Sequence, residues 1–296
     1  MLRSLIGPAT AGALTAGALL AGCASMGGNG SAMAGYDCSR AGLQAAVNDY
    51  LAAQSAGDAS LLRTADALSY MEDLEPADVS AGILTKALAI GYTNSLLDTD
   101  QCETFTEIYD PGPEEPYALG VHMTIADGAV SEIDTLVTTT GDWLFNAANM
   151  VLWAPEEDWG PVPAAEQLDR ETLIFAAGAY LDRFNDEDAP VPWGYPCRRI
   201  EGGARTGTGF NPDDTCEVGV PEGVEFPIRH YVVDTAANAV TVLVPFGGEG
   251  GLPDSHTFRL EDSKLRWVHT ITVCNREGMT CPQAQPAEEG PRPPNT

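Results

Sequence analysis

Basic residues are scarce in this chain. Its 296 residues include 15 Lys and Arg against 43 Asp and Glu, a formal net charge of −28, and the only lysines are Lys86 and Lys264. A surface of this charge repels phosphate backbones, which argues against nucleic acid as a partner. The acidic residues are spread along the chain instead of forming one tail, which favours a solvated, salt-adapted surface over a specific cation site.

Signature motifs of the large catalytic classes are also missing. The sequence has no GxSxG, no HExxH and no Walker-type loop, and no GxGxxG follows an expected strand and begins a helix. It has no CxxC pair, and no Glu or His recurs at the spacing of metal ligands. We therefore expect neither a cofactor nor a bound metal.

The first 22 residues have the pattern of a secretory signal. Arg3 supplies a positive start, and the Ala-, Gly- and Leu-rich run from Leu5 to Leu20 is too short for a stable transmembrane helix. One interpretation is a plain signal peptide followed by a chance cysteine.

The end of that run, Leu20-Ala21-Gly22-Cys23, resembles the lipobox of bacterial lipoproteins. The resemblance implies that residues 1–22 are removed and that Cys23 becomes an acylated N-terminus anchored in a lipid bilayer. Ala24 follows, and not the Asp that resembles an inner-membrane retention signal. We therefore expect an anchor in the bacterial outer membrane, facing the periplasm or the exterior.

Cysteine usage fits the same compartment. Apart from Cys23, six cysteines remain, an even number in an oxidising location. Six cysteines allow 15 connectivities. Loop lengths favour Cys197 with Cys216 and Cys274 with Cys281, which leaves Cys38 with Cys102. A zinc site and a thiol nucleophile are the alternatives, but the first lacks a CxxC pair and the second requires an unpaired cysteine.

The chain divides into a repeated central part and two irregular ends. Residues 23–35 form a flexible Gly- and Ser-rich tether, and residues 282–296 form a Pro-rich tail that we expect to be disordered. In each half, apolar residues at helical spacing are followed by segments with strand alternation. The sequence thus predicts two repeats, over residues 36–140 and 171–281, joined by an inter-repeat segment at 141–170.

Local patterns define the elements of each repeat. Helical periodicity ends near Gly57-Asp58 in the first half and before Asp186 in the second. Hairpins are predicted at 120–125 with 129–138, at 229–234 with 239–246, and at 256–261 with 264–273. This order predicts an α+β fold of two tandem cone-like repeats, each an N-terminal helix covering a curved antiparallel sheet.

The predicted order resembles the SnoaL-like, or nuclear transport factor 2-like, fold, in which a helix covers a strongly bent sheet around a pocket. Four strings also resemble blocks of an uncharacterised domain found mainly in secreted fungal proteins and in some bacterial ones. They are DWLFN at 142–146, PWGYPC at 192–197, RIEGG at 199–203 and LPDSH at 252–256. The second resemblance implies no activity, and the broader fold hosts isomerases, dehydratases, hydrolases and binding modules.

The final hairpin carries the sharpest functional hypothesis. With Asp262-Ser263 as a two-residue turn, the cross-strand pairs are Leu260 with Leu265, Phe258 with Trp267, and His256 with His269. A slip of one residue mixes polar and apolar side chains on each face. We therefore expect two neighbouring imidazoles on an apolar surface, suited to acid and base roles. The alternative is that each ring satisfies a local hydrogen bond in the core.

Three charged residues complete this candidate site. Arg199 is suited to hold a substrate carboxylate, and Glu201 supplies an acid beside the histidines. Asp254 is the carboxylate nearest to His256 in the sequence. A salt bridge of Arg199 and Glu201 with each other, or between the repeats, is the structural alternative.

A second set of acidic residues lies in the first repeat and in the inter-repeat segment. Superposing the last strands of the repeats places Glu132 and Asp134 on the face that holds His269 in the second repeat. They are candidates for the general acid and base of a second pocket, with a solvated sheet face as the alternative. Asp142 either joins such a pocket or caps the following helix.

These observations favour an extracytoplasmic lipoprotein that acts on a small organic or sugar-derived molecule by cofactor-independent acid/base chemistry of lyase, dehydratase or isomerase type. His256 and His269 are central to this hypothesis, with Glu201, Arg199 and Asp254 around them. The alternative is a noncatalytic lipoprotein that binds a small-molecule ligand or another envelope protein.

Overall fold

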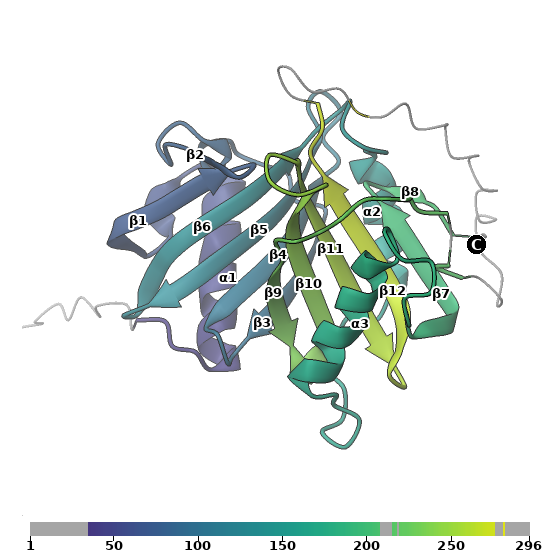
Figure 1. Cartoon of the computed structure of the whole chain (residues 1–296). Coiled ribbons are helices and arrows are strands. Elements are labelled where there is room, and N and C mark those ends of the chain that lie inside the picture. Colours follow the sequence, from purple (N-terminus) through teal and green to yellow (C-terminus); the bar gives the residue numbers. More distant parts are fainter. Residues whose placement is uncertain (1–34, 208–214, 218, 276–280, 282–296) are drawn as a thin grey trace, which may run out of the picture. The chain divides into compact units, whose positions relative to one another are not determined.

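Two β-sheets, each preceded by a helix, make up the described chain (Figure 1). The computed structural model describes residues 35–207, 215–217, 219–275 and 281. The predicted signal peptide, Cys23 and the predicted tail at 282–296 lie outside these ranges. The predicted α+β class is confirmed, and the element order is consistent with two tandem cone-like units. Within the described ranges, no helix combines the length and apolar character needed to cross a membrane.

The two halves of the chain contain the same sequence of elements. The first half comprises α1 (Arg40–Ala56), β1 (Thr64–Glu72), β2 (Glu75–Pro76), β3 (Tyr92–Asp98), β4 (Glu103–Asp110), β5 (Tyr117–Ala126) and β6 (Ala129–Thr138). The second comprises α3 (Arg170–Asp182), β7 (Trp193–Glu201), β8 (Ala204–Arg205), β9 (His230–Asp234), β10 (Ala239–Phe246), β11 (Leu252–Glu261) and β12 (Lys264–Thr272). Between them lie α2 (Ala147–Trp153) and a 3-10 turn, η3 (Ala154–Glu156).

Strand order is the same in both sheets. It is β2-β1-β6-β5-β4-β3 in the first sheet and β8-β7-β12-β11-β10-β9 in the second. The hairpins are antiparallel as expected, but β1 pairs with β6, and β7 with β12, in parallel. The sheets are therefore mixed and not purely antiparallel, because the first long strand of each repeat returns beside the last one.

Both helices begin at an N-cap that the sequence provides, and α1 also ends at a glycine cap. The Ser39 side chain accepts from the backbone N–H of Gly42 at the start of α1, and Gly57 ends that helix in the left-handed conformation with φ of 64°. The Asp169 side chain accepts from the backbone N–H of Thr172 at the start of α3. Each helix buries an apolar face against its own sheet, with Tyr50 and Tyr180 among the fully buried side chains.

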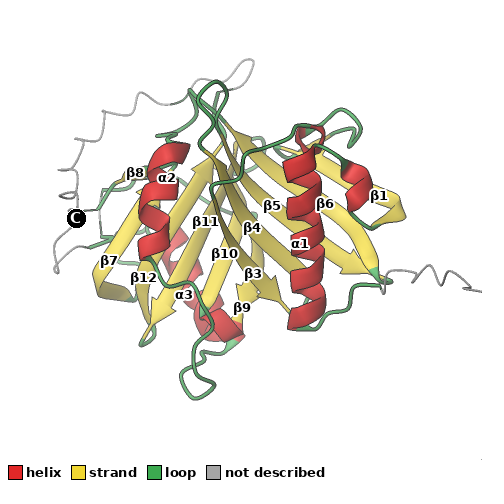
Figure 2. Cartoon of the chain, turned by 180° about the vertical axis from the view of Figure 1, so that it is seen from behind, coloured by secondary structure: helices red, strands yellow, loops and turns green. Residues whose placement is uncertain are grey.

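The sheet faces that point away from α1 and α3 pack against each other, and α2 contributes to this contact. Helix α1 lies in front of the first sheet in Figure 2, and α3 lies in front of the second in Figure 1. A third apolar cluster combines residues of both sheets and of α2, including Phe105 and Leu136 from the first sheet and Ile200, Leu243 and Ile271 from the second. Burial of this shared cluster joins the repeats into one unit that begins at Gly35.

Two buried aspartates, one in each repeat, each accept hydrogen bonds from the other repeat. Asp98 ends β3 and accepts from the Arg170 guanidinium at 2.6 Å and from the backbone N–H of Val233 at 2.9 Å. Asp234 ends β9 and accepts from Arg40 at 2.7 Å and from the backbone N–H of Leu97 at 3.1 Å. Each arginine is the first residue of its helix, so the same device occurs twice in opposite directions.

The three predicted disulfides are present. Cys38 pairs with Cys102, Cys197 with Cys216, and Cys274 with Cys281. None of the six cysteines is left for the thiolate zinc site or the thiol nucleophile considered above. The first disulfide closes 64 residues and ties the segment before α1 to the turn before β4.

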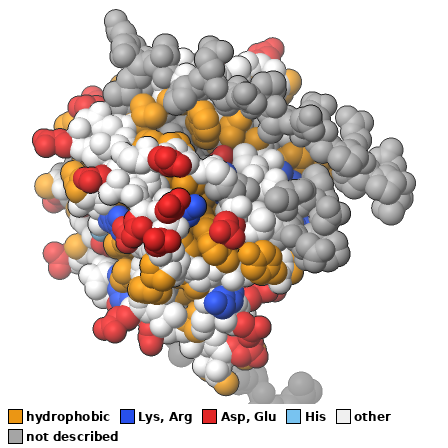
Figure 3. Space-filling model, turned by 45° about the vertical axis from the view of Figure 1, so that its right-hand side comes forward, with side chains coloured by type: hydrophobic (Ala, Val, Ile, Leu, Met, Phe, Trp, Pro, Cys, Tyr) orange, Lys and Arg blue, Asp and Glu red, His pale blue; other side chains and the backbone are white. Residues whose placement is uncertain are grey.

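Acidic side chains are scattered over the face of the molecule shown in Figure 3, with few Lys or Arg side chains between them. Several of the basic residues are engaged in ion pairs, among them Lys86 with Glu115, Arg229 with Asp182 and Arg266 with Glu261. Most of the acidic excess therefore has no basic side chain to neutralise it, in line with the net charge of −28.

Candidate functional site

The predicted pairing of His256 with His269 is wrong. The turn at Asp262-Ser263 forms, with φ of 50° and 59°, and Leu260 pairs with Leu265. A β-bulge then shifts the register between Arg259 and Leu260, so that His256 lies opposite Thr270 and His269 opposite Thr257. The two imidazoles consequently project from opposite faces of the sheet.

The cause of the bulge is visible in the sequence once the structure is known. Trp267 and Val268 are consecutive apolar residues, which strict alternation does not accommodate. The bulge places Val268 with Leu265 in the cluster beneath α3. Trp267 pairs with Arg259 in the new register, and the guanidinium of Arg266 lies 3.6 Å from the centre of its ring.

His256 lies beneath α3 among aromatic rings. It is 3% exposed, and the ring centres of Tyr180, Phe184 and Phe258 are 5.8, 6.1 and 6.2 Å away. Phe226 closes another side at 6.4 Å. The imidazole is therefore held in a largely apolar environment where polar contacts are strong.

A row of polar side chains crosses three strands beside His256. Glu201 of β7 and His256 of β11 both pair with Thr270 of β12, and all three belong to the face beneath α3. Asp254 lies on the same face, with its Oδ2 atom 3.2 Å from Nδ1 of His256. The Thr272 hydroxyl donates to the other oxygen of Asp254 at 2.8 Å.

Arg199 closes one end of this polar cluster. Its guanidinium donates to the Tyr180 hydroxyl at 2.9 Å and to the Thr206 hydroxyl at 2.8 Å, and it lies 3.4 Å from a Glu201 oxygen. Burial lowers the pKa of Arg199, but Tyr180 and Glu201 outweigh burial and leave it raised. For the Tyr180 hydroxyl the effect of burial has the opposite sign, and its pKa is raised. Arg199 and Glu201 thus form the predicted mutual ion pair.

Three buried atoms of this cluster have no hydrogen-bond partner among the described residues. They are Oδ2 of Asp254, Nδ1 of His256 and the hydroxyl oxygen of Thr270. The Asp254 and His256 atoms are close, but their geometry is not that of a hydrogen bond. Buried polar atoms are rarely left unpaired in proteins, so three of them on one face of the sheet mark this cluster as a candidate functional site.

His269 lies on the opposite face of the second sheet, between the repeats. Its Nδ1 is 2.8 Å from a Glu107 oxygen and its Nε2 is 2.7 Å from a Glu157 oxygen. Burial opposes the charge on the ring, but the two carboxylates outweigh it and raise the pKa of His269 to about 10. The Trp159 indole donates to the same Glu157 oxygen. His269 is therefore a charged cross-link between β12, β4 and the segment after η3.

Ionisation of His269 makes the stability depend on pH. Its pKa is about 10 in the folded protein and about 6.5 in an unfolded chain. The stabilisation is therefore complete below about pH 6.5 and is lost as pH rises through about 10. We expect the free energy of unfolding to fall between about pH 7 and about pH 10. Urea titrations of wild type and His269→Gln test this, since equally steep profiles would assign the dependence to other groups.

Glu132 and Asp134 line a common pocket. This pocket lies between the two sheets and not inside a separate first cone. It has a volume of about 310 Å³ and is also lined by Glu103 and the two remaining histidines, His122 and His230. Burial raises the pKa of Asp134, and His122 offsets this only in part. The sequence analysis did not identify either histidine, although β5 pairs His122 directly with Asp134.

Asp142 holds the chain between the repeats. One carboxylate oxygen accepts from the backbone N–H groups of Cys274 and Asn275 at 2.7 and 2.8 Å, and the other from that of Thr139. The cap of α2 is Asn146 and not Asp142, because the Asn146 side chain accepts from the backbone N–H of Asn149. The predicted helix cap at Asp142 is therefore wrong, and this residue does not line the pocket that contains Asp134.

The family comparison matches the second half of the chain. A family described as Domain of unknown function (DUF8021) matches residues 166–272, which span α3 to β12. No curated protein matches the sequence. Among solved structures, an NTF2-like protein from Bacteroides fragilis aligns with 80% of this chain and 97% of its own, at 13% identity and a TM-score of 0.17. The second half is thus similar to a family whose description states no activity.

Proposed function

We propose that this protein is a lipid-anchored envelope protein whose second repeat binds a small polar organic molecule and acts on it by acid/base chemistry. The observation that carries the proposal is the buried row of Glu201, Thr270 and His256 beside Asp254. An imidazole can accept and donate a proton, and the Asp254 carboxylate lies 3.2 Å from its Nδ1 atom. His256 with Asp254 replaces the pair of histidines that the sequence suggested.

The surroundings of His256 support this role. Aromatic rings exclude water from one side of the imidazole, and the unpartnered atoms of Asp254 and Thr270 offer hydrogen bonds to a guest. Arg199 is held by Tyr180 and Thr206, so it acts as a fixed positive charge that positions Glu201. Lyase, dehydratase or isomerase chemistry needs no more than such positioned groups.

The cellular setting rests on the sequence and on the disulfides. Three disulfides favour an oxidising compartment, and the lipobox-like string at 20–23 supports a lipid anchor. We further propose that each half adopts a SnoaL-like cone. The repeated strand order and the helix that covers each sheet support this assignment.

A metabolite screen with a point variant tests the activity. Purified full-length wild type, His256→Gln and the exposed control Glu187→Gln are incubated with a cellular extract, and mass spectrometry follows consumed and retained compounds. We expect wild type and the control to convert a compound that His256→Gln converts at least about 100-fold more slowly, because the variant lacks the proton acceptor. Melting temperatures verify that all three proteins are folded.

The other outcomes separate the two functional classes. Retention of a compound by wild type, without conversion and with loss of binding in His256→Gln, would support the noncatalytic binder. Conversion at equal rates by wild type and His256→Gln would remove His256 from the mechanism and reject the acid/base site.

A further inference from the structure

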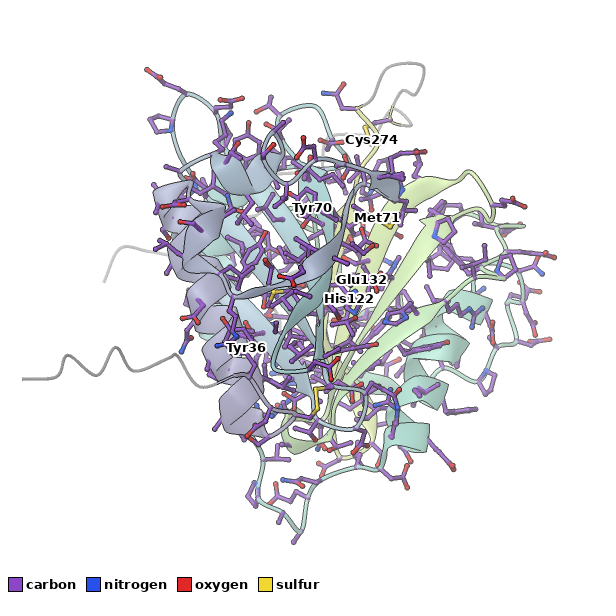
Figure 4. The ribbon with its side chains drawn as sticks, turned by 90° about the vertical axis from the view of Figure 1, so that its left-hand side faces the viewer. Tyr36, Tyr70, Met71, His122, Glu132 and Cys274 are labelled. Atoms are coloured by element: carbon purple, nitrogen blue, oxygen red, sulfur yellow. A yellow bond between two sulfur atoms is a disulfide. The ribbon has the colours of Figure 1, made fainter. Side chains whose placement is uncertain are left out.

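The pocket between the sheets has its own set of chemical groups. It has a volume of about 310 Å³ and lies on the side of each sheet that faces away from its helix. His122 and Glu132 lie close together there (Figure 4). The lining residues are Glu103, His122, Thr124, Glu132, Asp134, His230 and Leu243. None of them belongs to the polar cluster around His256, so this pocket is independent of the function proposed above.

Three side chains converge at one point of this pocket. Nε2 of His230 is 3.0 Å from Oε2 of Glu103, and Nε2 of His122 is 3.6 Å from the same oxygen. One ligand atom of each residue lies within 4.8 Å of both others. The two imidazoles meet edge to face with 4.8 Å between ring centres. The three groups come from β4, β5 and β9, hence from both sheets.

The buried histidine of this set has one ring nitrogen without a hydrogen bond. His122 is 5% exposed, and its Nε2 atom makes no hydrogen bond with any described residue. Oδ1 of Asp134 is likewise buried and unpartnered, and β5 and β6 place it directly beside His122. Leaving such atoms unsatisfied costs free energy, so an additional group that binds them would stabilise the folded protein.

We propose that Glu103, His122 and His230 bind a divalent transition-metal ion of the Zn²⁺ type. Two imidazoles and one carboxylate are a usual ligand set for this ion, and His nitrogen favours it over Mg²⁺ or Ca²⁺. Bonds of about 2.0–2.1 Å in a tetrahedron hold ligand atoms about 3.4 Å apart. The separations of 3.0 and 3.6 Å are already close to this value. Only small side-chain movements are needed.

Asp134 and Glu132 complete the surroundings of the ion. Three protein ligands leave a fourth position for water or for a carboxylate, and Asp134 is a candidate because its unpartnered oxygen belongs to the residue paired with His122. A divalent charge also offsets the mutual repulsion of three acidic groups in one pocket. The site is incomplete without His230, which means that it exists only when both repeats are folded together.

Zinc titration of the full-length chain tests the site. Isothermal titration with Zn²⁺ is carried out with excess Mg²⁺, which occupies surface carboxylates but competes poorly for imidazole. We expect one tight site per chain in wild type and in the exposed control Glu114→Gln. His230→Gln should lower the affinity by more than about tenfold. Because the His230 side chain is 49% exposed, this variant is expected to fold.

Cobalt absorption gives a second readout. Co²⁺ in wild type should show the intense visible bands of a four-coordinate ion, and these bands should disappear in His122→Gln and in His230→Gln. No tight Zn²⁺ site in wild type, or equal affinity in wild type and both variants, would overturn the proposal and leave an ion pair only. Conversion of metabolites by the His256 site has no bearing on this result.

Discussion

Replacing His269 with Leu is expected to lower the free energy of unfolding by about 3–5 kcal/mol. The ring is fully buried and holds Glu107 at 2.8 Å and Glu157 at 2.7 Å. Its removal leaves two buried carboxylates that face each other without a cation, and such uncompensated charges are the costliest result of breaking a buried ion pair. Urea unfolding of both proteins at about pH 7 measures the loss.

A triple variant controls for the loss of shape. Glu107→Gln and Glu157→Gln combined with His269→Leu remove all three charges, and we expect this variant to recover part of the lost stability because no buried charge remains. A loss below about 0.5 kcal/mol in His269→Leu alone would show that the triad is not a significant cross-link. A triple variant less stable than the single one would assign the loss to packing.

The local features of the fold could be predicted because their signals are local. Gly57 ends α1 in the conformation that glycine favours, and Asp127-Gly128 forms the β5–β6 turn with φ of 51° and 80°. Short loops between cysteines predicted two disulfides, and the two cysteines left over predicted the third. Each of these inferences depends on residues that are neighbours in the sequence or on simple counting.

The arrangement of the site depended on features without such signals. One extra residue at Arg266 reversed the orientation of His269 relative to His256, and no local motif marks where a bulge must occur. The search for ligand spacing missed His122 and His230 because they are 108 residues apart and meet only when the sheets pack. Glu132 and Asp134 were found by comparing the repeats, since equivalent strands place equivalent faces together.

The contact between the sheets was not predicted either. The sequence predicts that each half is a cone around its own pocket, whereas the sheet faces turned away from α1 and α3 are buried against one another around Phe105, Leu136 and Ile271. Glu107 interrupts the face of the first sheet, and Glu157 lies in the inter-repeat segment; both mimic solvated positions in the sequence. They are buried because the second repeat supplies His269 as a partner.

The two buried aspartates connect each repeat to the other. Asp98→Asn is expected to cost about 2–4 kcal/mol, which is less than for a fully buried pair because Arg170 is 24% exposed and water screens it. The side-chain amide introduced by Asp98→Asn would also turn an N–H donor toward the N–H donors of Arg170 or Val233, which then lose an acceptor. Asp234→Asn should cost a similar amount because Arg40 and Leu97 repeat the arrangement. Chemical denaturation measures each loss.

The exposed neighbour Asp100 provides the matched control. Asp100→Asn removes the same charge from the same turn and should change stability by less than about 0.5 kcal/mol. The double variant Asp98→Asn with Asp234→Asn should deviate from additivity, because the two carboxylates bind backbone groups of adjacent strand ends, Val233 and Leu97. A single unfolding transition at reduced denaturant would show that the repeats still unfold together. Strict additivity, with each loss no larger than that of Asp100→Asn, would mean that Asp98 and Asp234 contribute nothing to joining the two sheets.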